Sequence, residues 1–130
     1  AGGPNNQLVT IDTSTGLVTP IGPGNVFTGS WEGNGIAFAP DDTLYGSSYD
    51  GDNMLLTIDR TSGLATKIAN FTQNSTTDGS VKAFTFIAGV LFAIEQDRSG
   101  GASLVTVDLG TAVTTPIGLL PDVSALAYAP

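Results

Sequence analysis

The sequence predicts an all-β fold made of repeated four-stranded antiparallel units, and three observations support this. The segment Leu8-Val9-Thr10-Ile11-Asp12 returns in similar form at residues 55–59 and 104–108, at spacings of 47 and 49 residues. Only 12% of the residues are charged, while seventeen Gly and seven Pro supply turns. Residues 35–40 alternate small and large apolar side chains, as strands do. A repeat of about this length is typical of one blade of a β-propeller.

Each repeat opens with a pair of strands joined by a Thr- and Gly-rich turn. Residues 8–12 alternate with period two, residues 13–16 form the turn, and residues 17–22 form the second strand. The same pair aligns without a gap at residues 55–59 and 64–69, and again at 104–108 and 113–118. Proline occupies one position of the second strand, as Pro20 and Pro116. Because proline cannot donate to a central ladder, we expect this strand at a sheet edge.

The second pair of strands in each repeat carries no charge in its first member. Residues 35–40 and 83–88, and a last copy at 125–130, alternate small and large apolar residues. This pattern predicts a strand that is buried on both faces and lies nearest the axis of the propeller. It is followed by a short turn and by strands at residues 43–49 and 90–95.

These assignments predict eleven strands, or about 2.75 four-stranded antiparallel blades, in one domain that spans residues 1–130. The repeats cover approximately residues 5–50, 51–99 and 100–130. Because closed propellers have four to eight blades, the ring is expected to be incomplete. We therefore expect open sheet edges that pair with another copy or with the rest of a longer chain. The sequence begins with Ala-Gly-Gly-Pro instead of Met, which favours a processed form or a piece of a longer chain.

The composition argues against several classes of function. A formal net charge of −8, from twelve acidic and four basic residues, is unlike the basic surface of a nucleic-acid-binding protein. No apolar run is long enough to insert into a membrane as a helix. The sequence contains no Cys and no His, so thiolate and imidazole chemistry are excluded. We therefore expect a protein that is not an enzyme.

The repeat resembles one found in secreted β-propeller proteins of bacteria and archaea. The resemblance rests on the pattern L-x-T-I-D-x-x-T-G-x-x-T-x-I-G, followed by G-I-A-F-x-P-D-x-T-L-Y-G, which residues 8–22 and 35–46 carry in full. It implies a secreted, extracellular or cell-surface location and a structural role. The enzymes among propeller proteins use His or several clustered acids, which this sequence lacks.

One loop contains the best candidate for a metal site. Asp50, Asp52 and Asn53 place two carboxylates and an amide oxygen within four residues, and these are ligands that suit Ca²⁺. The alternative is a turn in which the same side chains cap the backbone. A complete EF-hand loop would need more acids and a distal Glu, which are absent. No other cofactor is expected.

Two further loops contain candidate binding or modification residues. Trp31, with Glu32 and Asn34, would suit a platform on which a glycan stacks, although a single Trp in a Gly-rich loop also serves to fill a core. Asn70 and Asn74 each begin an N-x-[S/T] glycosylation pattern, which also arises by chance in a Thr-rich chain.

The recurring acids Asp12, Asp59 and Asp108 are expected to accept backbone N–H bonds in their own turns. Glu32 and Glu95 are the only glutamates, and as a pair they would be the sole support for glycoside hydrolysis. The function expected from the sequence is a non-enzymatic extracellular scaffold, structural or adhesive. A module that binds a glycan or Ca²⁺ through its loops is the main alternative, and a hydrolase or lyase fragment is a weaker one.

Overall fold

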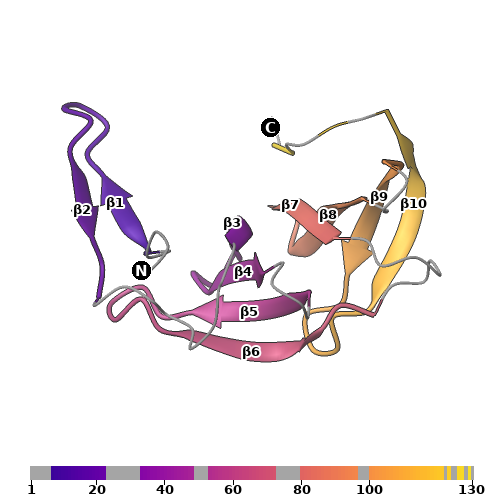
Figure 1. Cartoon of the computed structure of the whole chain (residues 1–130), viewed down its shortest axis with the longest axis horizontal. Coiled ribbons are helices and arrows are strands. Elements are labelled where there is room, and N and C mark those ends of the chain that lie inside the picture. The colour runs from indigo at the N-terminus through magenta and orange to yellow at the C-terminus, as the bar shows by residue number, and fades with distance from the viewer. Residues whose placement is uncertain are drawn as a thin grey trace, which may run out of the picture.

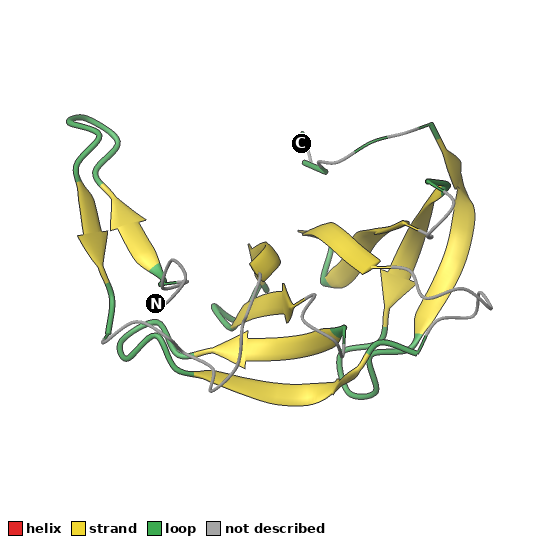
Figure 2. Ribbon diagram, viewed as in Figure 1, coloured by secondary structure: helices red, strands yellow, loops and turns green. Residues whose placement is uncertain are grey.

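The computed structural model describes residues 7–22, 33–48, 53–72, 80–96 and 100–121, together with residues 123, 126, 127 and 129. Over these residues the chain is all-β and contains no helix, and so none that could cross a membrane (Figure 2). Ten strands follow one another along the chain: β1 (Val9–Ile11), β2 (Val18–Pro20), β3 (Gly33–Phe38), β4 (Leu44–Ser48), β5 (Met54–Ile58), β6 (Ala65–Asn70), β7 (Ser80–Ile87), β8 (Val90–Gln96), β9 (Ala102–Val107) and β10 (Thr114–Leu120).

The strands form three antiparallel sheets, none of which is closed. One sheet contains only β1 and β2, and the other two contain four strands each, in the orders β3-β4-β5-β6 and β7-β8-β9-β10. Within each of the two larger sheets, strands that are consecutive in sequence lie side by side. Figure 1 shows the sheets arranged along an arc, with β3 and β7 on its inner side and β6 and β10 on its outer side.

These ten strands agree with the strands predicted from the sequence. The Thr-Ile-Asp segments lie on β1, β5 and β9, and the proline-bearing strands β2 and β10 lie at sheet edges, as predicted. The eleventh strand, predicted over residues 125–130, is not formed by the described residues of that segment, Leu126, Ala127 and Ala129.

Both larger sheets carry β-bulges at equivalent positions. The register between β5 and β6 skips Ile68, and the register between β9 and β10 skips Ile117, the residue at the same position of the repeat. A second pair of bulges skips Asn34 on β3 and Lys82 on β7. Since a bulge bends and twists the strand that carries it, the two sheets acquire the same curvature from the same repeat positions.

The two larger sheets pack together where β3 meets β7. A Cβ atom on Gly35 would lie 3.3 Å from the Cα of Ala83 and 3.3 Å from the carbonyl oxygen of Lys82, which is a tight contact, so glycine suits this close backbone approach. A core of buried apolar side chains joins the two sheets, and each Leu, Val or Phe side chain in it contributes about 1.5–3 kcal/mol when fully buried. Its members are Leu55, Phe71, Val81, Phe84, Leu91, Ala93, Val105, Val107 and Ala112.

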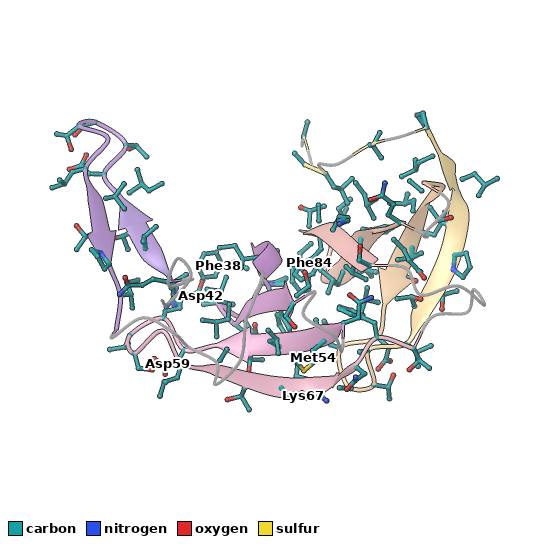
Figure 3. The ribbon with its side chains drawn as sticks, viewed as in Figure 1. Phe38, Asp42, Met54, Asp59, Lys67 and Phe84 are labelled. Atoms are coloured by element: carbon teal, nitrogen blue, oxygen red, sulfur yellow. The ribbon has the colours of Figure 1, made fainter. Side chains whose placement is uncertain are left out.

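The other face of β3 is exposed, so the prediction of a strand buried on both faces is wrong for β3. Ala37 packs against the core, but Ile36 and Phe38 are exposed. Among the described strands only β4 and β7 contact β3, which leaves the side chains that point away from β7 uncovered. Figure 3 shows Phe38 on the side of β3 that is nearer the β1–β2 hairpin, whereas Phe84 lies between the two larger sheets.

The β1–β2 hairpin contacts the neighbouring sheet through two glycines. Gly63 has φ +71°, and a Cβ atom there would lie 2.9 Å from the carbonyl oxygen of Ile21. Gly22 also has φ +71°, and a Cβ atom on it would collide with the carbonyl group of Ser62. The residues that follow β2 thus pack against the turn between β5 and β6.

This contact predicts different costs for alanine at Gly63 and Gly16, which occupy the same turn position. Gly16 has φ +72° and open space around it, so Gly16→Ala should cost only the left-handed backbone strain of about 1 kcal/mol. Gly63→Ala adds a clash with Ile21, and overpacking of this kind costs a further ~1–3 kcal/mol. Chemical denaturation measures both free energies of unfolding, and equal losses would contradict the contact.

Candidate functional site

Most of the residues predicted to bind a ligand lie outside the described part of the chain. This holds for Trp31, Glu32, Asp50, Asp52 and Asn74. The backbone of Asn34 lies at the bulge of β3. The predicted calcium and glycan sites therefore stay predictions. Within the described residues, no three acidic side chains come together in a group that could hold a metal ion.

Asn53 and Asn70 lie close together at one end of the β5–β6 pair. Asn53 has φ +37°, and its carbonyl oxygen accepts a 2.8 Å hydrogen bond from the N–H of Phe71. Asn70 is the last residue of β6, pairs with Met54 and is exposed. The backbone of Asn53 thus anchors the chain where β6 ends, and Asn70 is accessible there for the predicted modification.

The recurring aspartates accept hydrogen bonds in their own turns, as predicted. Oδ1 of Asp59 accepts from the N–H groups of Thr61 and Ser62, at 2.9 and 2.7 Å, and from the Ser62 hydroxyl at 2.9 Å. Asp12 and Asp108 accept from the N–H groups at the same two turn positions in the other two repeats. The hydroxyl donor is Thr111 for Asp108, at the position of Ser62, and Ser14 for Asp12, one position earlier. In every copy the backbone carbonyl of the Asp also accepts a hydrogen bond from the N–H four residues later. Both the side chain and the backbone of the Asp therefore stabilise the turn.

These hydrogen bonds lower the pKa of each aspartate below its ordinary value of 3.8. The largest cause is the side-chain hydrogen bond of Ser14 for Asp12 and of Thr111 for Asp108, and the backbone hydrogen bond of Ser62 for Asp59. All three carboxyls are exposed. They are charged acceptors that hold the turns, so their recurrence follows from the repeated fold.

Glu95, near the end of β8, is the one acidic side chain that is buried among the described residues. It is 8% exposed, and Oε2 accepts a 3.1 Å hydrogen bond from the hydroxyl of Thr114 on β10. Burial raises the pKa of Glu95 above its ordinary value of 4.5, and the hydrogen bond from Thr114 opposes that shift. A buried carboxyl with a raised pKa is a feature that functional sites often share.

The surroundings of Glu95 belong to the junction between the two larger sheets. Beyond the end of β6, Thr72 forms a parallel bridge with Val113: the Thr72 N–H donates to Ala112 at 3.2 Å, and the Thr114 N–H donates to Thr72 at 3.3 Å. The Thr114 hydroxyl lies 3.4 Å from the Thr72 carbonyl and closer to Glu95. When Glu95 takes up a proton it can donate to this hydroxyl, which is then free to donate to Thr72.

The other four-stranded sheet has different residues at these two positions. Ser48 on β4 stands where β8 has Glu95, and Ala65 on β6 stands where β10 has Thr114. Ser48 is fully buried, and its hydroxyl has no hydrogen-bond partner among the described residues. Glu95 stands out in the sequence only as half of a possible catalytic pair. The signal for its pairing with Thr114 is that an acid and a hydroxyl together replace Ser and Ala at equivalent positions.

The chemistry available at this junction is that of a single carboxyl. Glycoside hydrolysis needs two carboxyls across a cleft, and the other glutamate, Glu32, lies outside the described residues. The Thr114 hydroxyl donates to the Glu95 carboxylate, and this hydrogen bond joins β8 to β10 across β9.

Replacing Asp59 tests the role of the charged turns. Its lowered pKa means that the folded state binds this proton less tightly than the unfolded chain, so stability is present above pH 3.8 and lost as pH falls through the folded pKa. Asp59→Asn should lower the melting temperature at neutral pH and flatten its decline in acid. Asp42→Asn is the control, because it changes the same charge in a turn whose φ of +67° suits Asn. Equal melting curves for the two variants would contradict this role.

Replacing Glu95 should have the opposite effect at neutral pH. Its raised pKa means that the folded state holds this proton more tightly, so stability falls as pH rises from 4.5 through the folded pKa. Glu95→Gln keeps an acceptor for Thr114 and removes the buried charge. We expect a higher melting temperature at neutral pH and no gain well below pH 4.5.

A double-mutant cycle with Thr114 completes this test. Thr114→Val keeps the shape of the side chain and leaves Glu95 without its donor, which should cost about 1–3 kcal/mol at neutral pH. The loss should be smaller in the Glu95→Gln background. Additive effects of the two substitutions would show that the two side chains do not interact.

Comparison with known proteins identifies the repeat but assigns it no activity. No curated protein matches the chain. A family model matches residues 1–128, which is nearly the whole chain. The chain therefore belongs to the family described as a repeat of unknown function (DUF6923).

Proposed function

We propose that the two four-stranded sheets are blades of a β-propeller and that the protein is a non-enzymatic extracellular scaffold with a structural or adhesive role. The strand order supports the blade assignment, because the strand with alternating small and large residues is first in both sheets and lies inside the arc (Figure 1). The extracellular location is inferred from the resemblance of the repeats to those of secreted propellers. The scaffold associates with further copies, or with the rest of a longer chain, through open sheet edges.

One observation carries this proposal: the apolar side chains of β1 are exposed where their equivalents are buried. Val9 is 39% exposed and Ile11 60%. The residues at the same two positions of β5 and β9 are exposed by 6% or less: Leu56, Ile58, Val105 and Val107. β5 and β9 each pair with a strand on both sides, whereas β2 is the only described strand that pairs with β1. An uncovered strand edge with apolar side chains is a site for association.

Light scattering after size-exclusion chromatography tests this function. We expect the mass of the parent chain to rise with concentration, and Ile11→Lys to prevent the rise because a charge on an edge strand blocks pairing. Leu64→Lys is a matched control. The exposed fraction of Leu64, 56%, is similar to the 60% of Ile11, but Leu64 lies in the turn between β5 and β6. A parent chain that stays monomeric, or equal effects of the two variants, would overturn association through this edge.

A further inference from the structure

We infer that the free edge of β1 and the exposed face of β3 together form a docking site for one two-stranded β-hairpin of the same repeat. The inference rests on the proposed blade architecture and names the partner that the open edge takes. The partner consists of an inner strand with alternating small and large residues, a short turn, and a second strand that pairs with β1. The hairpins β3–β4 and β7–β8 are two examples of it within this chain.

The residues that would pair with β1 can be read from the other two sheets, where β5 and β9 are the strands equivalent to β1. In these sheets a leucine lies opposite the residue equivalent to Ile11: Leu44 opposite Ile58, and Leu91 opposite Val107. A small residue lies opposite the residue equivalent to Val9. These small residues are Gly46, opposite Leu56, and Ala93, opposite Val105. A strand that reads Leu, any residue, then Gly or Ala therefore fits the edge of β1 in one register.

The exposed face of β3 supplies the second half of the site. Ile36 is 52% exposed, whereas Phe84, at the same repeat position on β7, is 5% exposed because the preceding sheet packs on it. Phe38, next on this face, is also exposed, and the guanidinium of Arg60 lies 5.4 Å from the centre of its ring. An inner strand placed on this face would cover Ile36 as β3 covers Phe84.

One hairpin can cover both the edge of β1 and the exposed face of β3. Within the chain, one hairpin does both: β4 pairs with the edge of β5 while β3 packs against β7. A Cβ atom on Gly35 would already be in tight contact there, at 3.3 Å, so a small residue suits that position of the docked strand. The β1–β2 hairpin is held to the next sheet by the contacts of Gly22 and Gly63, which fixes the edge and the face in one place.

A chain extended by its own hairpin tests the inference. A copy of residues 33–48 is placed directly before Gly2, so that residues 2–6 occupy the positions that residues 49–53 hold before β5. We expect slower amide hydrogen exchange in β1, a higher melting temperature, and a monomer at concentrations where the parent chain associates. The control carries Leu44→Asp and Gly46→Asp in the copy only, and its β1 should exchange as in the parent. Unchanged exchange in the extended chain would overturn the inference.

A disulfide gives a second readout that does not depend on the gain in stability. The chain has no cysteine, so Ile11→Cys and Leu44→Cys in the copy create one pair of thiols. In the inferred register their Cβ atoms lie within about 4.5–5.5 Å, and oxidation should link them within one molecule. Tyr45→Cys in the copy is the control, since its side chain points to the other face of the strand. Equal disulfide formation in the two variants, or none in either, would contradict the register. A disulfide between two molecules would show that a second copy occupies the site.

These results separate the inference from the proposed function. If the parent chain is monomeric but the extended chain protects β1, the hairpin site stands and self-association fails. If the parent chain associates but the extension leaves β1 unprotected, the scaffold function stands and the hairpin site fails. Each outcome is read from a different measurement, light scattering in one case and exchange in the other.

Discussion

The structure depends on one constraint: the strand that carries the recurring Thr-Ile-Asp segment must be hydrogen-bonded along both of its edges. In β5 and β9 this holds, and their apolar side chains are buried between neighbouring strands and sheets. The aspartate that ends each of these strands then closes the turn to the outer strand. Among the described strands β1 pairs with β2 alone, and apolar side chains of β1 and of one face of β3 are exposed.

The sequence predicted the strands, their order and the aspartate turns because each of these depends on residues that are close together in the chain. Alternation of apolar residues, proline at an edge and an acid before a Gly-containing turn are local signals. The prediction for the strand at residues 35–40 was wrong on one face, because burial depends on what packs against a strand. Ile36 and Phe84 have the same pattern around them but different neighbours.

The sheet junction could not be predicted, since its contacts join distant residues. Thr72 pairs with Val113, in a different repeat, and the Thr114 hydroxyl reaches Glu95 across β9. Neither residue pair has a characteristic spacing. The only signal is the difference between repeats, where Ser48 and Ala65 give way to Glu95 and Thr114. The residues predicted to bind calcium or a glycan lie mostly in loops outside the described part of the chain.

The paired β-bulges have a consequence for how such repeats can be combined. A strand with a bulge at Ile68 or Ile117 cannot slide along its neighbour by one residue, because the extra residue would then oppose the wrong partner and every side chain would change face. The two four-stranded sheets therefore have register-fixing bulges at the same repeat positions, and their other strand pairings also use equivalent registers. A strand of one sheet thus meets the same pairing geometry as the equivalent strand of the other, whatever its place in the chain.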